Sequence, residues 1–161
     1  MNKFTPLVKG VITAVIMIAI SLAIYYSKAS GTSAVGYIIY VVYAAGIIWT
    51  LVDFSKQHPD KRQFSTLFSQ GFRCFIIIAL LMVAFTGIMF QLHPEWADEA
   101  AVLYREDLVK QGNKTPVEID QMVATGKKQF ALSNIASAIF GYLITGALMT
   151  AVASGFLLRR K

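Results

Sequence analysis

The residues of this chain that could bind a metal ion or transfer a proton are few and scattered. Its two histidines, His58 and His93, each stand beside a proline in a polar stretch, and we interpret both as solvated turn residues. The single cysteine, Cys74, has no second cysteine for a disulfide or a CxxC pair, and it reads as a small apolar residue of a helix. The spacing of these residues predicts no metal site and no bound cofactor.

Acidic residues offer one weak cation site. Glu95, Asp98 and Glu99 follow His93 closely, but acids are also typical of the first turn of a helix, where they face the positive end of its dipole. We favour the helix-start interpretation. No GxSxG, HExxH, phosphate-binding loop or dinucleotide fingerprint occurs in the chain. We therefore expect a protein that is not an enzyme.

Four long uncharged segments make up most of the chain and must hold its few reactive side chains in place. They are Gly10–Ser27, Ala29–Val52, Cys74–Leu92 and Gln129–Leu158. About 20 apolar residues cross a hydrocarbon core of ~30 Å, and these runs lack the alternation of a membrane β-barrel strand. The sequence predicts an all-α integral membrane four-helix bundle, a single membrane domain over 1–161 with spans at 7–27, 34–53, 73–92 and 130–157.

Basic residues are distributed unevenly between the two sides of the membrane. Nine lie on the side of the two termini and of the second connection, against six on the other side. The positive-inside rule then predicts that both termini are cytoplasmic, and that the acidic third connection faces outward. Lys9, Asp53 and Arg73 lie near the inner ends of spans, where we expect their side chains to snorkel toward water. The sequence contains no nucleic-acid-binding motif, and the lipid bilayer is the expected environment.

The second connection contains an apolar pattern with helical spacing. Phe64, Leu67, Phe68 and Phe72 recur every three or four residues, with polar and basic residues between them. This pattern predicts an amphipathic helix that lies in the cytoplasmic interface. Gly71 is a natural position either for a bend into the third span or for close approach of another helix.

The third connection, 95–128, predicts a helical hairpin outside the membrane. Its first helix is predicted to run from Glu95 to Lys110, and Gly112 just beyond is the signal that stops it. The second begins with the capping box formed by Thr115 and Glu118, and we expect it to continue into the fourth span.

Small residues four positions apart mark the fourth span. Ser133, Ser137, Gly141 and Thr145 form one row, and Gly146, Thr150 and Ser154 repeat the spacing on a neighbouring face. Small residues let helix backbones approach closely in a membrane. We predict that the first row is a tight helix contact, either within this bundle or against a second chain.

The layout resembles a bacterial family catalogued as domain of unknown function 4199, which is common in Bacteroidota. The resemblance rests on the four-span plan, on Phe64-Ser65-x-x-Phe68-x-x-Gly71-Phe72, and on the stretch from Phe90 through Pro94-Glu95. It covers nearly the whole chain. It implies a multi-pass protein of the bacterial inner membrane and supplies no activity.

Two functions remain open at this point. The first is an accessory or scaffold subunit that binds a membrane protein partner or forms a homo-oligomer. The alternative is a small transporter or lipid-handling protein, which should open a polar cavity lined by Ser133, Ser137, Tyr142 or Thr145.

Overall fold

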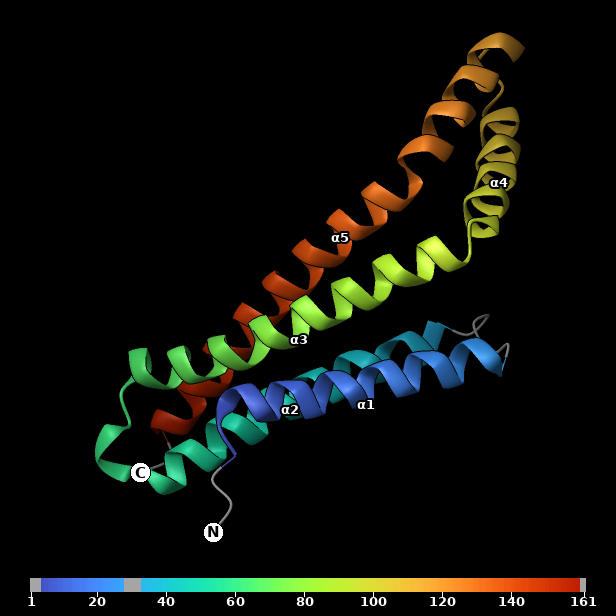
Figure 1. Cartoon of the computed structure of the whole chain (residues 1–161). Coiled ribbons are helices and arrows are strands. Elements are labelled where there is room, and N and C mark those ends of the chain that lie inside the picture. Colours follow the sequence, from blue (N-terminus) through green and yellow to red (C-terminus); the bar gives the residue numbers. More distant parts are fainter. Residues whose placement is uncertain (1–3, 28–32, 160–161) are drawn as a thin grey trace. The chain divides into compact units, whose positions relative to one another are not determined.

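The computed structural model describes residues 4–27 and 33–159, which form five α-helices, one short 3-10 helix and no strand (Figure 1). The elements are α1 (Pro6–Tyr26), α2 (Ser33–Gln57), η2 (Pro59–Lys61), α3 (Phe64–Leu92), α4 (Glu95–Gln111) and α5 (Pro116–Arg159). The basic residues Lys3, Lys28, Arg160 and Lys161, which entered the charge argument, lie outside the described residues.

Four helices are long and apolar enough to cross a membrane: α1, the Tyr37–Gln57 part of α2, α3 and α5. Each predicted span lies within the full length of α1, α2, α3 or α5, or ends one residue beyond it. The prediction of an all-α, multi-pass membrane protein is therefore confirmed.

Contacts divide the chain into two units. Unit 1 comprises Met1–Met82 with Ile139–Lys161, and unit 2 comprises Val83–Ala138. Helices α3 and α5 each contribute one end to unit 1 and the other end to unit 2.

Unit 1 is held together by close approach of helix backbones. Helices α1 and α2 run antiparallel and side by side (Figure 1). Gly71 of α3 faces Thr150 of α5, and a Cβ at Gly71 would overlap the Thr150 methyl group. Lipid is as apolar as the side chains it would replace, so tight packing rather than escape from water stabilises such contacts. Glycine at these positions allows the packing.

The predicted amphipathic segment is helical but is not a separate element. Phe64 to Phe72 forms the first turns of α3, which continues without interruption to Leu92. Of the two roles considered for Gly71, the structure shows close helix approach. Phe64 and Phe72 are exposed. Leu67 was expected to face the membrane interface together with them, but it is fully buried inside the protein. The position of this segment in the membrane interface stays a prediction.

Unit 2 contains the predicted helical hairpin. Helix α4 ends at Gly112, whose φ of +65° is the left-handed conformation that glycine adopts without strain. The capping box forms as predicted, because the Thr115 amide donates to Glu118 Oε2 at 2.8 Å. Leu108 and Ile119 are buried, and Arg105 of α4 pairs with Asp120 of α5. Helix α5 then continues through Gly126, as expected, to a length of 44 residues.

Candidate interaction site

An apolar groove of about 520 Å³ runs along α5 in unit 1. Ile48 and Val52 of α2 form one wall. The rest of the lining comes from two rows of α5, each with a spacing of four residues: Thr145, Met149, Ala153 and Leu157, and Leu148, Val152 and Phe156. Rows of this spacing are the ridges and grooves by which one helix packs on another. The shape therefore suits a helix.

The groove continues the predicted row of small residues. Thr145 belongs to both, and Gly141 lies one turn before it on α5. A Cβ at Gly141 would meet no atom within 4 Å, and Ser133 and Ser137 are exposed. The row therefore makes no tight contact at Gly141 with the described residues. Contact of this row with a second chain stays a prediction.

The neighbouring row makes the contacts within this chain. Thr150 and Ser154 are fully buried, and a Cβ at Gly146 would lie 2.8 Å from the Phe75 ring and would overlap the Tyr43 hydroxyl. Both rows carry the same spacing of small residues, so spacing alone did not separate them. The two rows could have been distinguished by the large aromatic residues of the neighbouring helices. Tyr43 and Phe75 need a position without a side chain opposite them, and Gly146 provides it.

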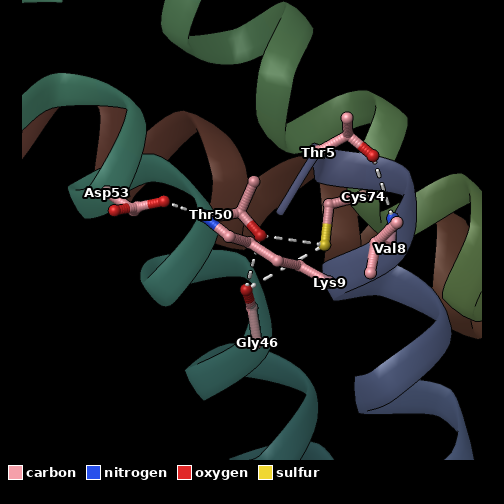
Figure 2. Close-up of polar contacts among 7 residues, drawn as sticks. All are labelled: Thr5, Val8, Lys9, Gly46, Thr50, Asp53 and Cys74. Carbon is pink, nitrogen blue, oxygen red and sulfur yellow. Dashed lines mark hydrogen bonds and ion pairs between the residues drawn. The ribbon is translucent and has the colours of Figure 1, made fainter. Parts of the chain in front are cut away.

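An ion pair between a buried lysine and a half-exposed aspartate joins the start of α1 to the end of α2, which corrects the expectation that the Lys9 side chain snorkels toward water. Only 4% of the Lys9 side chain is exposed, and its Nζ pairs with Asp53 (Figure 2). The ammonium also lies 5.3 Å from the centre of the Trp49 ring, within cation–π range. The Asp53 carboxylate and the face of the Trp49 ring thus surround the Lys9 ammonium in place of water. Sequence reasoning missed this pair, although both residues stand at the same end of consecutive antiparallel spans.

The thiol of Cys74 takes part in a second polar contact beside this pair. The Thr50 hydroxyl donates to the Gly46 carbonyl oxygen at 2.9 Å and lies 3.3 Å from Cys74 Sγ (Figure 2). Cys74 is fully buried, which agrees with its interpretation as a small core residue. These contacts link α2 to α3 and add to the cohesion of unit 1.

The histidines are less solvated than predicted. His58 stacks on Phe54 with ring centres 4.8 Å apart, and its Nδ1 is buried without a hydrogen-bond partner among the described residues. His93 stacks on Trp96 and contacts Glu95 Oε1 through Nδ1 at 2.7 Å. This hydrogen bond holds the pKa of the exposed Glu95 carboxyl below its usual value.

Two of the three acids that follow His93 form pairs: Glu95 with His93, and Asp98 with a lysine. Asp98 of α4 pairs with Lys127 of α5, and this contact joins the two helices of the hairpin. Among the described residues no group of three or more His, Cys, Asp or Glu side chains could hold a metal ion.

Two residues expected in a transporter cavity have other surroundings. Thr145 lines the apolar groove. The Tyr142 ring packs edge-on against Tyr43 at 5.7 Å, and the Tyr43 hydroxyl donates to the Tyr142 carbonyl oxygen at 2.9 Å. Neither arrangement supports the polar cavity that a transporter requires.

Comparison with known proteins gives a family but no activity. No curated protein and no solved structure matches the chain. Residues 9–159 match the family described as "Protein of unknown function (DUF4199)". Since the match covers nearly the whole chain, the protein belongs to the DUF4199 family.

Proposed function

We propose that this protein is a non-enzymatic accessory subunit of a membrane complex, and that the groove along α5 binds a transmembrane helix of its partner. The observation that carries the proposal is the groove itself, whose row through Thr145 is continued by Gly141, where an added Cβ would meet no atom within 4 Å. It supports a binding role because grooves with rows four residues apart accept the side-chain ridges of another helix.

The dimensions of this surface favour a helix that crosses the membrane. The row extends from Gly141 to Leu157, and at 1.5 Å per residue this corresponds to about 24 Å of helix. That length is most of a hydrocarbon core ~30 Å thick. The lining of the groove is almost wholly apolar, as a partner helix buried in lipid requires.

Crosslinking from defined positions tests the proposal. A photoreactive residue would replace Ala153, which lines the groove, and in a second protein Ala151, which is equally half-buried on α5 but does not line it. We expect the probe at position 153 to give one dominant crosslinked protein in native membranes, and the probe at position 151 to give much less of it.

Substitution provides a second readout of the same surface. Ala153→Leu fills the groove and should reduce recovery of the crosslinked partner in mild detergent, whereas Ala151→Leu should not. A crosslink between two copies of this chain would identify the occupant as a homo-oligomer and reject the accessory-subunit assignment. A monodisperse monomer with no crosslink would reject both.

We further propose that the end of unit 1 carrying Lys9 and Asp53 faces the cytoplasm of a bacterial inner membrane. The excess of basic residues on that side supports this orientation. A cysteine at Asn113 should react with an impermeant thiol reagent in cells whose inner membrane is intact, while one appended after Lys161 should resist it. The reverse pattern would invert the topology.

A further inference from the structure

A cavity of about 240 Å³ lies in unit 2, between the two helices of the outer hairpin. Small residues form its walls on both helices: Ala97, Ala100 and Ala101 on α4, and Gly126 on α5. Every residue that lines it belongs to unit 2, so its shape depends on contacts within that unit alone. It shares no lining residue with the groove of unit 1.

Two aromatic rings also line the cavity, one from each helix. Tyr104 of α4 lies beside Gly126, because a Cβ added there would be 3.5 Å from the Tyr104 ring. Phe130 of α5 packs edge-on against Phe90 with ring centres 5.5 Å apart, and Phe90 packs in the same way on Trp96 at 5.8 Å. Rings attract other rings in edge-on and offset arrangements, so this lining favours an aromatic ligand.

The glycine in the wall has no role in packing α4 on α5. At Gly46, Gly71 and Gly146 of unit 1 an added Cβ would overlap a neighbouring side chain, whereas at Gly126 it would make only an ordinary contact with Tyr104. Glycine inside a helix is less stable than alanine, and Gly126 lies within the continuous α5. The contacts of the described residues do not require glycine at this position, but its missing side chain leaves the cavity wider.

The charges around the cavity favour a neutral ligand. Lys127 is the charged residue of the lining, and its ammonium pairs with Asp98 of α4. The positive charge is therefore balanced within the hairpin. The remaining lining consists of alanine, glycine, tyrosine and phenylalanine, which bind rings by packing.

The volume limits the size of the ligand. An apolar cavity of about 150 Å³ is large enough for benzene, and sites for drug-sized molecules begin near 300 Å³. A cavity of about 240 Å³ lies between these values and suits one ring or two fused rings.

We infer that this cavity binds a small neutral aromatic molecule, with its ring between Tyr104 and Phe130. The hairpin is predicted to lie outside the membrane, so such a molecule reaches the cavity from water. The inference does not depend on the proposed partner helix, which binds to a different unit of the chain.

Nuclear magnetic resonance of the full chain in lipid nanodiscs tests the inference with indole as the probe. The alanine methyl groups would be labelled with carbon-13, because a bound ring shifts the resonances of methyl groups beside it. We expect saturable shifts at Ala97, Ala100 and Ala101, and none at Ala124 or Ala131, which are exposed on α5 and do not line the cavity.

Competition measures the preference for an aromatic ring. Phenol and cyclohexanol match in size and carry the same hydroxyl group, but only phenol is aromatic. We expect phenol to displace indole at about a fivefold lower concentration than cyclohexanol. Tyr104→Leu keeps the wall apolar and removes one ring, so it should remove most of this difference.

Filling the cavity should abolish binding. Ala100→Leu places a branched side chain in the space and should weaken indole binding by at least about tenfold, while Ala124→Leu should leave it unchanged. Should Ala100→Leu fail to fold, Gly126→Ala replaces it, because its added methyl makes only an ordinary contact. This variant narrows the cavity and should weaken indole binding by about threefold.

Four outcomes would overturn the inference. Shifts that grow without saturation at every alanine would show partition of indole into the bilayer, and saturable shifts centred on Ala124 or Ala131 would place the site elsewhere. Equal potency of phenol and cyclohexanol would remove the aromatic preference. Unchanged indole binding in the variant that fills or narrows the cavity would decide against the cavity itself.

Discussion

Two faces of α5 carry the same sequence pattern and have different surroundings. The row Gly146, Thr150 and Ser154 is buried, whereas in the other row Ser133 and Ser137 are exposed and an added Cβ at Gly141 would meet no atom within 4 Å. The difference teaches that small residues four apart permit a helix contact without specifying it. The row that packs within the chain is the one whose glycine, Gly146, lies against the large rings of Tyr43 and Phe75 on the facing helices.

The largest effect that separates the two faces is expected at Gly146. Gly146→Leu would force a side chain into the space of Tyr43 and Phe75, and overpacking of this kind costs about 1–3 kcal/mol or more. Thermal unfolding in detergent should therefore show a clearly lower Tm. Gly155→Leu is the matched control, because a Cβ at Gly155 meets nothing within 4 Å. Equal Tm values for the two variants would remove the distinction between the faces.

A smaller effect is expected at Gly71, where the added group is a single methyl. Gly71→Ala should destabilise the chain by about 1–2 kcal/mol through its overlap with Thr150. Thr150→Ala removes the overlapping methyl together with a hydroxyl that is buried without a partner among the described residues. The double variant should recover most of the loss, and a double-mutant cycle in thermal unfolding measures this coupling. Simple additivity would argue against the contact.

On the open face, Gly141→Leu should leave the stability of the isolated chain within about 0.5 kcal/mol of the original. It should nevertheless reduce recovery of the partner from native membranes, because a branched side chain would then occupy the row that the partner helix approaches. Gly155→Leu and the volume-conserving Ile139→Leu should leave recovery unchanged. Unchanged recovery for Gly141→Leu as well would assign this face to lipid.

The smallest effect is expected when the pH is lowered, which should break a contact at the start of α4 and leave the packing of both faces of α5 unchanged. The pKa of Glu95 is lowered by its hydrogen bond to His93, so the contact stabilises α4 above the usual carboxyl pKa of 4.5 and is lost as pH falls through the lower folded value. Nuclear magnetic resonance should follow this titration on Glu95 and show it nearer 4.5 in His93→Phe. A concurrent change in the burial of Thr150 would show that the packed face also responds to acid.

Much of the architecture followed from local rules. The four long apolar helices, the capping box of Thr115 and Glu118 and the end of α4 at Gly112 depend on residues close in sequence, and the structure contains all three. The choice between the two rows of α5 could not be predicted, because it depends on which residues the other helices present. The Lys9–Asp53 pair was missed for a related reason. A lysine near the end of a span can reach water or a partner, and only the tertiary structure distinguishes the two.

The Lys9–Asp53 pair also has a consequence for how the protein is made. Asp53 stands 44 residues after Lys9 in the chain, so the first span leaves the ribosome before the second one does. During that interval the lysine has no carboxylate to neutralise it and must remain at the headgroup level, since a charge is costly to bury alone. Arrival of α2 then allows Lys9 to leave the lipid surface and enter the protein. We therefore expect α1 and α2 to settle in the membrane as a pair, with α1 reaching its final depth only once α2 has been inserted.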